Sequence, residues 1–177
     1  MFKEVLFNFL DMSVRDNHKM LPIHINQKVK DHPLKLSNNI TTELSSLLKN
    51  SPVLLVFVRG TWCPFCRLHM GRLRNWVNKI KDKQNVTVIV VSSEPIDVVR
   101  EWLSENKMPY LYASDQNYEL ADQFGVRVED NSFFQGSTFL INTDMTVKLA
   151  YTGKRTQANF DAMEYAVSSL GTDQVAA

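Results

Sequence analysis

The ten residues that decide the fold of this chain are Phe57-Val58-Arg59-Gly60-Thr61-Trp62-Cys63-Pro64-Phe65-Cys66, which include both cysteines of the protein. The run Pro52–Val58 is continuously apolar and rich in β-branched residues, which predicts a buried strand. Pro64 suits the first position of a helix, where the N–H that proline lacks would have no partner. The stretch therefore predicts a strand followed directly by a helix, with Cys63 at the helix N-cap and Cys66 in the first turn.

The predicted helix gives the two thiols different surroundings. From Cys66 onward, apolar residues recur with spacings of four, three, four and three, at Met70, Leu73, Val77 and Ile80. This spacing predicts one buried stripe along a helix that runs to about Lys81. Cys66 begins the stripe, so we expect its side chain to face the core, whereas that of Cys63 should face solvent.

The surroundings of Cys63 favour its thiolate form. A thiol at a helix N-terminus lies at the positive end of the helix dipole. The sequence has no Asp or Glu between Glu43 and Asp82, but in that interval it contains Arg59, Arg67, Arg72, Arg74, Lys79 and Lys81. We therefore predict that Cys63 is the nucleophile and that Cys66 is a buried, less reactive resolving thiol.

Three other roles for the cysteines compete with redox chemistry. A structural disulfide across so short a loop would remove little conformational entropy from the unfolded chain. His69 extends the pattern to Cys-x-x-Cys-x-x-His, but a structural zinc site needs a fourth ligand, and His18, His24 and His32 show no ligand spacing. Both cysteines could also be plain core residues. The proline in the motif, the preceding aromatic residue and the cap position favour a redox dithiol, and we expect no bound metal.

Length and composition describe an ordinary globular protein. The 177 residues predict a single domain over positions 1–177, and the net charge of +1 argues against nucleic acid or a membrane as a partner. Charges interrupt Met1–Leu10 and no cleavage site follows, so residues 1–20 are interpreted as a helical extension with Val5, Leu6, Phe9 and Leu10 on one face. Residues 171–177 are predicted to form a tail. Two cysteines in one motif fit a reducing compartment, so we expect a cytoplasmic protein.

The remaining elements follow from hydrophobic period and turn residues. We predict strands at Leu21–Ile25, Leu34–Leu36, Val86–Val91, Pro109–Ala113, Thr138–Asn142 and Val147–Tyr151, the last two joined by a turn at Asn142–Thr146. We predict helices at Thr41–Lys49, with Thr41 or Thr42 as N-cap, and at Pro95–Asn106, Tyr118–Phe124 and Gln157–Leu170. A βαβ half followed by an antiparallel half predicts an α/β fold with a mixed central sheet and helices on both faces. The cysteine motif then lies at the carboxyl end of a central strand, the usual place for a site in such a sheet.

Four segments agree in order and spacing with one known family: Pro52–Cys66, Ser114–Asp115, Leu120–Val126 and Ser137–Asn142. Over roughly Leu21–Leu170 the chain resembles the thioredoxin superfamily. More narrowly, it resembles the peroxiredoxin-like branch, the alkyl hydroperoxide reductase and thiol-specific antioxidant (AhpC/TSA) family. The resemblance implies a thioredoxin-like fold and a thiol-based oxidoreductase that uses an external thiol reductant and no bound cofactor.

The chain departs from typical peroxiredoxins around the sulfur atoms. In that family a proline stands at the position of Arg59, a threonine or serine at Cys63, the peroxidatic cysteine at Cys66 and an arginine at Gly136. These groups position and activate peroxide, so their replacement here implies slow reaction with peroxide. The resemblance favours Cys66 as the nucleophile, whereas the helix geometry favours Cys63, which we prefer. Ser137 takes the position of the cis-proline that faces the active site in thioredoxins.

We predict a thiol–disulfide oxidoreductase with Cys63 and Cys66 as its catalytic residues. Substrate-contacting or activating residues are expected at Arg59, Thr61, Trp62, Pro64, Phe65, Arg67 and Ser137. The expected partners are a disulfide-bearing protein, or a small-molecule disulfide or hydroperoxide, together with a thiol reductant system. The oligomeric state stays open, a homodimer included.

Two alternative functions remain. The first is a thiol peroxidase, a peroxiredoxin-like antioxidant that reduces hydroperoxides. The second is a non-enzymatic redox sensor or partner-binding module, for which Phe133 and Phe134 would supply apolar surface. We expect both phenylalanines to pack against the core instead.

Overall fold

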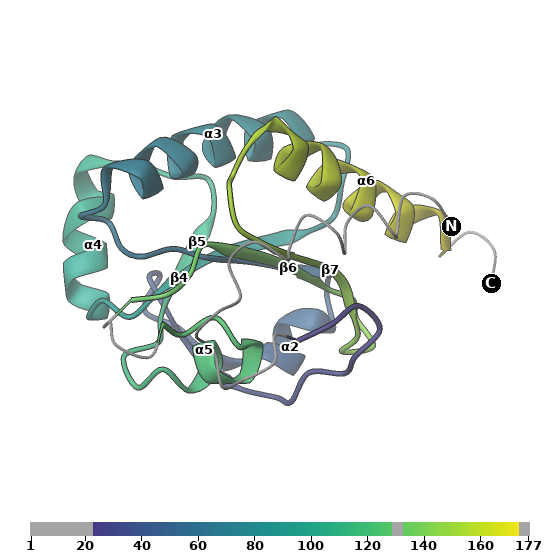
Figure 1. The fold of residues 1–177 in the computed structure, drawn as a ribbon, viewed down its shortest axis with the longest axis horizontal. Helices are drawn as coiled ribbons and strands as arrows, with labels where there is room; N and C mark the ends of the chain where they lie inside the picture. The colour runs from purple at the N-terminus through teal and green to yellow at the C-terminus, as the bar shows by residue number, and fades with distance from the viewer. Residues whose placement is uncertain (1–22, 129–132, 174–177) are drawn as a thin grey trace.

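The computed structural model describes residues 23–128 and 133–173, which build one seven-stranded sheet with helices on both faces (Figure 1). The strands are β1 (Pro33–Leu36), β2 (Thr41–Glu43), β3 (Val53–Phe57), β4 (Thr87–Ser92), β5 (Leu111–Ser114), β6 (Ser137–Ile141) and β7 (Val147–Thr152). Their order across the sheet is β2-β1-β5-β4-β3-β6-β7. The β3–β4 and β4–β5 pairs are parallel and the others antiparallel. The predicted mixed central sheet is therefore confirmed.

Five helices cover the two faces of this sheet in the described parts of the chain. They are α2 (Leu44–Leu48), α3 (Pro64–Ile80), α4 (Ile96–Glu105), α5 (Glu119–Phe124) and α6 (Gln157–Asp173). One hydrophobic cluster joins α3, α4 and α6 to the sheet, and a second joins α2 and α5 to its other face. The same two layers are visible on either side of the edge-on sheet in Figure 1. None of these helices is long and apolar enough to cross a membrane.

Strand β3 is buried on both faces because it is central. It pairs in parallel with β4 and antiparallel with β6, and all five of its side chains are fully buried. Leu54 and Val56 belong to the α3 side of the core, while Val53, Leu55 and Phe57 belong to the α5 side. Each such side chain contributes roughly 1.5–3 kcal/mol by burial. The continuous apolar run in the sequence is thus the signature of a strand covered on both faces.

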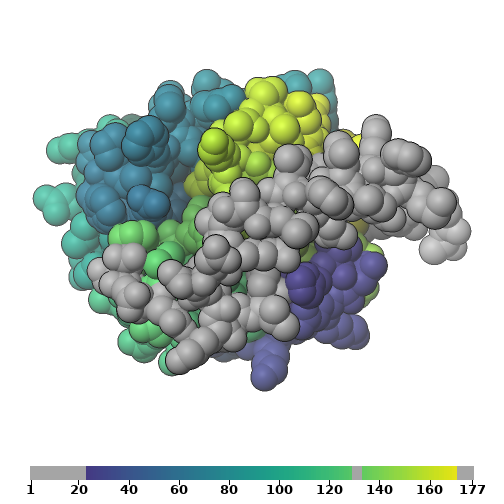
Figure 2. Space-filling model, viewed as in Figure 1, coloured from purple at the N-terminus to yellow at the C-terminus, as the bar shows by residue number. Residues whose placement is uncertain are grey.

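Helix α3 follows β3 as the spacing predicted. Met70, Leu73, Val77 and Ile80 are all buried, so the predicted stripe is confirmed. Helix α6 packs beside α3 on the same face of the sheet, and Figure 2 shows the two as adjacent surface segments. An ion pair of 3.1 Å between Lys79 and Glu164 links them. The buried residues that α3 and α6 share in one hydrophobic cluster hold the carboxyl-terminal helix against the helix that carries the cysteines.

Two predicted elements near the start of the described chain are wrong. Thr41–Glu43, predicted as the first turn of a helix, is strand β2, because these residues pair with β1 in a hairpin and satisfy their backbone groups there. The helix α2 begins only at Leu44, and Glu43 rather than a threonine occupies its N-cap. Ile23–Ile25, the described part of the predicted strand Leu21–Ile25, form no strand. The predicted N-terminal helix with Val5, Leu6, Phe9 and Leu10 lies outside the described residues.

The later elements agree with the sequence pattern within a few residues. Strands β4 and β5, helix α4 and the hairpin of β6 and β7 all lie at the predicted positions. Gly125 ends α5 in the left-handed conformation, with φ of 66°. Helix α6 continues to Asp173, three residues beyond its predicted end, into the segment that was predicted as a tail. Residues 174–177 lie outside the described chain.

Candidate active site

The strand-to-helix junction places both cysteines at the start of α3. Cys63 is the N-cap, with an extended backbone, and Pro64 occupies the first helical position, as predicted. The Cys63 carbonyl accepts a hydrogen bond of 2.9 Å from the N–H of Arg67, which closes the first turn. Both cysteines are free thiols. The predicted positions of Cys63 at the N-cap and of Cys66 in the first turn of the helix are therefore confirmed.

The predicted exposure of Cys63 is wrong, because its side chain is only 4% exposed and that of Cys66 is 8% exposed. Capping position alone would leave the Cys63 thiol open to solvent. The segments Gln135–Gly136 and Gly153–Thr156 instead face it across a shared pocket. Both thiols therefore line this pocket and not the open surface.

The two thiols differ in acidity in the predicted direction. Burial by itself raises the pKa of Cys63, but hydrogen bonds from the Cys66 and Phe65 N–H groups and from the Cys66 thiol, with the charge of Arg59, bring it below its ordinary value. Burial raises the pKa of Cys66, and the neighbouring Cys63 raises it further. Cys63 is therefore the thiol that ionises first.

A pocket of about 590 Å³ opens beside the two thiols. One wall comes from the start of α3 and the residues before it: Arg59, Cys63, Phe65, Cys66, Leu68, His69 and Arg72. The other wall comes from the segments before β6 and after β7: Gln135, Gly136, Gly153, Lys154, Arg155 and Thr156. Of the predicted site residues, Arg59, Cys63, Phe65 and Cys66 meet here. Its volume lies within the usual range of small-molecule sites.

The other predicted substrate-contacting residues do not line the pocket. Trp62 and Pro64 are exposed outside it, and Trp62 stacks edge-on against Phe133 with ring centroids 6.3 Å apart. The Arg67 guanidinium is held by the Thr61 carbonyl. Ser137 is fully buried, and its hydroxyl turns to Gln135 and Thr152. Arg67 and Ser137 are therefore engaged by the protein itself, whereas Trp62 and Pro64 stay exposed beside Cys63.

The two adjacent phenylalanines behave differently. Phe134 is fully buried and packs against Phe57 with ring centroids 5.8 Å apart, as predicted. Phe133 is half-buried, and the Arg59 guanidinium lies over its ring at 4.8 Å. Phe133 therefore helps to place a basic side chain at the mouth of the pocket.

Glu94 is a supporting residue that sequence reasoning missed. Its carboxylate accepts hydrogen bonds from the Thr61 N–H at 2.8 Å, the Thr61 hydroxyl at 2.7 Å and the Ser92 hydroxyl at 3.0 Å. Glu94 thus holds the loop immediately before Cys63 from the adjacent strand end. Gly60 is needed in this loop, because a Cβ there would lie 2.3 Å from the Trp62 indole nitrogen. The sequence does contain a signal for this role: Glu94 follows β4, and the ends of the parallel strands β3 and β4 meet at the same edge of the sheet.

We expect Glu94→Gln to destabilise the protein by about 1–3 kcal/mol, because a neutral amide replaces the carboxylate that accepts charge-assisted hydrogen bonds from Thr61 and Ser92. Urea unfolding measures this change, and alkylation kinetics measure the accompanying loss of thiol reactivity. Asp97→Asn serves as the control, since that carboxylate is exposed and its partner among the described residues is Arg100. Unchanged stability and unchanged thiol reactivity in Glu94→Gln would contradict the supporting role.

Arg155 occupies the space beside Gly136, the position at which the family has an arginine. A Cβ on Gly136 would lie 3.1–3.2 Å from three guanidinium atoms of Arg155, so the glycine makes room for this side chain. The guanidinium donates to the carbonyls of Phe57 and Ser137 at the ends of β3 and β6. Burial lowers the pKa of Arg155 to about 10, while the thiolate charges of Cys66 and Cys63 act in the opposite direction. The side chain therefore stays cationic at neutral pH.

His69 is a buried neutral imidazole beside the cysteines. It is 3% exposed, and burial, with the charges of Arg155 and Arg72, lowers its pKa to about 2. Neither ring nitrogen has a hydrogen-bond partner in the described structure, and the ring lies 5.4 Å from that of Phe160. Residues 23–128 and 133–173 contain no group of three or more His, Cys, Asp or Glu side chains that could hold a metal ion.

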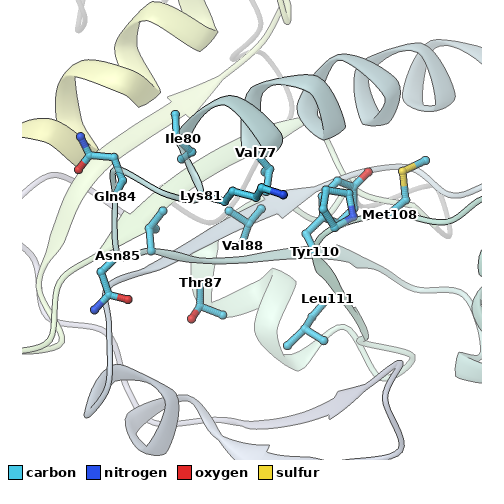
Figure 3. A pocket seen from close by; sticks show the side chains of 12 residues that line it. Val77, Ile80, Lys81, Gln84, Asn85, Thr87, Val88, Met108, Tyr110 and Leu111 are labelled. Atoms are coloured by element: carbon cyan, nitrogen blue, oxygen red, sulfur yellow. The ribbon is translucent and has the colours of Figure 1, made fainter.

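A second pocket of about 510 Å³ lies at the opposite end of the sheet (Figure 3). It is bordered by the last turn of α3, with Val77 and Lys81, and by the amino ends of β4 and β5, at Thr87 and Leu111. Because β3 and β4 are parallel, the cysteine motif lies at the other edge. No cysteine lines this second pocket, so the thiol chemistry belongs to the first.

Comparison with known proteins shows the family to which this chain belongs. The family model described as "AhpC/TSA family" matches residues 25–150, which is most of the chain. The chain belongs to the AhpC/TSA family, and its fold is thioredoxin-like.

The individual proteins that match this chain share 30% or less of its sequence in the comparisons described next. A "Thioredoxin-like protein" of Haemophilus influenzae is 30% identical over 108 residues, which cover 60% of this chain and 62% of that protein, less than two thirds of its length. The crystal structure of peroxidoxin BcpB from Mycobacterium tuberculosis matches with a TM-score of 0.72 and 22% identity, covering 85% of this chain and 97% of the other. The crystal structure of a cysteine-to-serine mutant of PrxQ from Xylella fastidiosa matches with a TM-score of 0.73 and 19% identity, covering 87% and 99%.

Proposed function

We propose that this protein is a thiol–disulfide oxidoreductase that cycles the Cys63–Cys66 dithiol. One observation carries the proposal: two free thiols one helical turn apart line the same pocket, and their pKa values are displaced in opposite directions. A nucleophile with a lowered pKa beside a resolving thiol is the arrangement that disulfide exchange requires. The name of the Haemophilus influenzae relative agrees with this assignment.

The reaction proceeds in two exchange steps. The Cys63 thiolate attacks one sulfur of the substrate disulfide, forms a mixed disulfide and releases the other half as a thiolate. Cys66 then loses its proton to solvent and attacks the Cys63 sulfur, which releases the second half as a thiolate. Both released thiolates take protons from solvent, and two electrons have passed from the dithiol to the substrate. An external thiol system reduces the resulting Cys63–Cys66 disulfide, so no bound cofactor is needed.

Reduction of hydroperoxides is the second candidate function. The peroxidoxin among the structural relatives and the cationic Arg155 beside Gly136 favour it. In that reaction a thiolate attacks the peroxide, an alcohol or water leaves, and the second thiol converts the sulfenic acid to the same disulfide with loss of water. The hydroxyl that the family has at the position of Cys63 is still missing, and loss of one such donor commonly costs about a hundredfold in rate.

We expect reduction of a small neutral disulfide to be faster than reduction of hydrogen peroxide. Stopped-flow fluorescence of the three tryptophans, with Trp62 adjoining Cys63, can follow both half-reactions in one protein preparation. Multiple turnover with excess dithiol separates an enzyme from a redox sensor, which changes state once. Much faster oxidation by peroxide would give precedence to the peroxidase, and failure to turn over either oxidant would support the sensor.

A further inference from the structure

The described side chains that line the active-site pocket carry charges of one sign only. The described residues that line it include four basic ones, Arg59, Arg72, Lys154 and Arg155, and no Asp or Glu. The chain as a whole is balanced, with 20 basic and 19 acidic residues. The basic character is therefore local to this pocket and is not a property of the whole surface.

Among residues 23–128 and 133–173, no carboxylate forms an ion pair with any of the four cations. Elsewhere in the described structure, basic residues form ion pairs, as Arg100 does with Asp97 at 3.0 Å and Arg127 with Asp122 at 3.2 Å. Arg72 makes one hydrogen bond of 3.4 Å to the Arg155 carbonyl and otherwise lies over Phe160. A bound anion would relieve the mutual repulsion of these charges.

The same pocket carries an apolar rim. Phe65 is 83% exposed and Leu68 is 66% exposed, and both line the pocket from the first turns of α3. They are three residues apart, so their side chains lie on the same face of the helix. Exposed apolar side chains beside a reactive centre favour an organic molecule over a bare inorganic anion.

We propose that this pocket selects an organic disulfide that carries a carboxylate group. This proposal rests on the proposed function, in which the substrate disulfide reacts with Cys63 in the pocket. The organic part lies against Phe65 and Leu68, and the carboxylate pairs with Arg72, farther along α3, and with Lys154 on the opposite wall. Arg155, whose guanidinium is occupied by two backbone carbonyls, remains next to the sulfur atoms. The bonds formed and broken are those of the exchange reaction already described.

The test compares three small disulfides that differ mainly in charge. These are 3,3′-dithiodipropionate, which is anionic, 2-hydroxyethyl disulfide, which is neutral, and cystamine, which is cationic. Each rate is divided by the rate of the same disulfide with free dithiothreitol, which removes differences in intrinsic reactivity. We expect the corrected rate to fall by about tenfold or more from the anionic to the cationic compound, and this range to shrink at high salt.

Variants locate the preference within the pocket. In Arg72→Gln and Lys154→Gln, we expect the ratio of the anionic to the neutral rate to fall about 3- to 10-fold. Arg74→Gln is the matched control, because Arg74 is exposed on the same helix but does not line the pocket. A ratio that is unchanged in both pocket variants, or equally reduced in the control, would overturn the proposal.

A binding experiment separates this proposal from the proposed function. The thioether 3,3′-thiodipropionate cannot exchange with thiols, and its binding to the reduced protein can be measured by calorimetry or by protection of Cys63 from alkylation. We expect saturable binding that weakens in Arg72→Gln, with sulfate binding less tightly. Equal binding of sulfate, or no binding of the thioether, refutes the anionic organic pocket. A protein that binds the thioether but reduces none of the disulfides would instead refute the oxidoreductase assignment.

Discussion

Replacing Cys63 by serine should reduce disulfide turnover by more than about a thousandfold, because the variant loses the nucleophile itself. The thiol of Cys66 remains in that variant, but burial raises its pKa and little of it is ionised near neutral pH. The measurement is reduction of 2-hydroxyethyl disulfide with excess dithiothreitol. Far-UV circular dichroism establishes that the variant is folded.

Cys66→Ser is the matched variant, and it should fail at a different step. Cys63 can still attack, so the mixed disulfide should accumulate and appear in intact mass spectrometry as one substrate adduct on Cys63. The reverse pattern, an adduct trapped on Cys66 in Cys63→Ser and no reaction in Cys66→Ser, would assign the nucleophile to Cys66. That is the assignment that the family pattern implies, and the two variants decide between them.

Replacing Arg155 by methionine should slow the reactions of the thiols by roughly 10- to 100-fold. The variant loses the guanidinium that lies in the pocket near both sulfur atoms and can stabilise negative charge there. The positive charge favours both thiolates, so its loss should move the pH midpoint of thiol alkylation upward. At neutral pH a smaller fraction of thiolate would then be present. The pH profile of iodoacetamide labelling measures this shift directly, and a merely structural role would leave the midpoint in place.

Three further variants sharpen the prediction for Arg155. Arg155→Lys keeps the charge but loses the planar fork, so we expect partial recovery. Gly136→Ala adds a Cβ at 3.1 Å from the guanidinium and should produce an intermediate effect by displacing it. Arg74→Met, which removes an exposed cation from the same helix as the cysteines, should behave like the wild type. An unchanged pH midpoint in Arg155→Met would exclude Arg155 from the chemistry.

Much of the fold is predictable because its signals are local. The apolar run Pro52–Val58 had to be covered on both faces, and β3 is central in the sheet. The stripe beginning at Cys66 determined which face of α3 packs on the core. Strand β2 was not predicted because Thr41–Glu43 form a strand only through their pairing with β1. A polar segment of three residues is too short to show the alternation of apolar and polar residues that indicates a strand.

Other parts of the active site depend on contacts that the sequence order conceals. Glu94 lies 33 residues from Thr61, and Arg155 lies 98 residues from Phe57, whose carbonyl it binds. The sequence has a glycine, Gly136, at the position where the family has an arginine, and this predicts that the active site lacks a guanidinium. The structure brings a guanidinium to that place from another segment, which a pattern anchored to sequence positions cannot detect.

The sequence by itself determined the strand-to-helix junction, the cap position of Cys63 and the buried position of Cys66. Each of these follows from local sterics and hydrophobic period, which act over one or two turns of chain. The tertiary structure alone decided that Cys63 is buried, that the thiols open into a basic pocket, and that Arg155 stands beside Gly136. Those features arise where the ends of β3 and β6 and the segment after β7 meet. Their physical basis is long-range packing, because the groups that set the charge and accessibility of a thiol act through space and not along the chain.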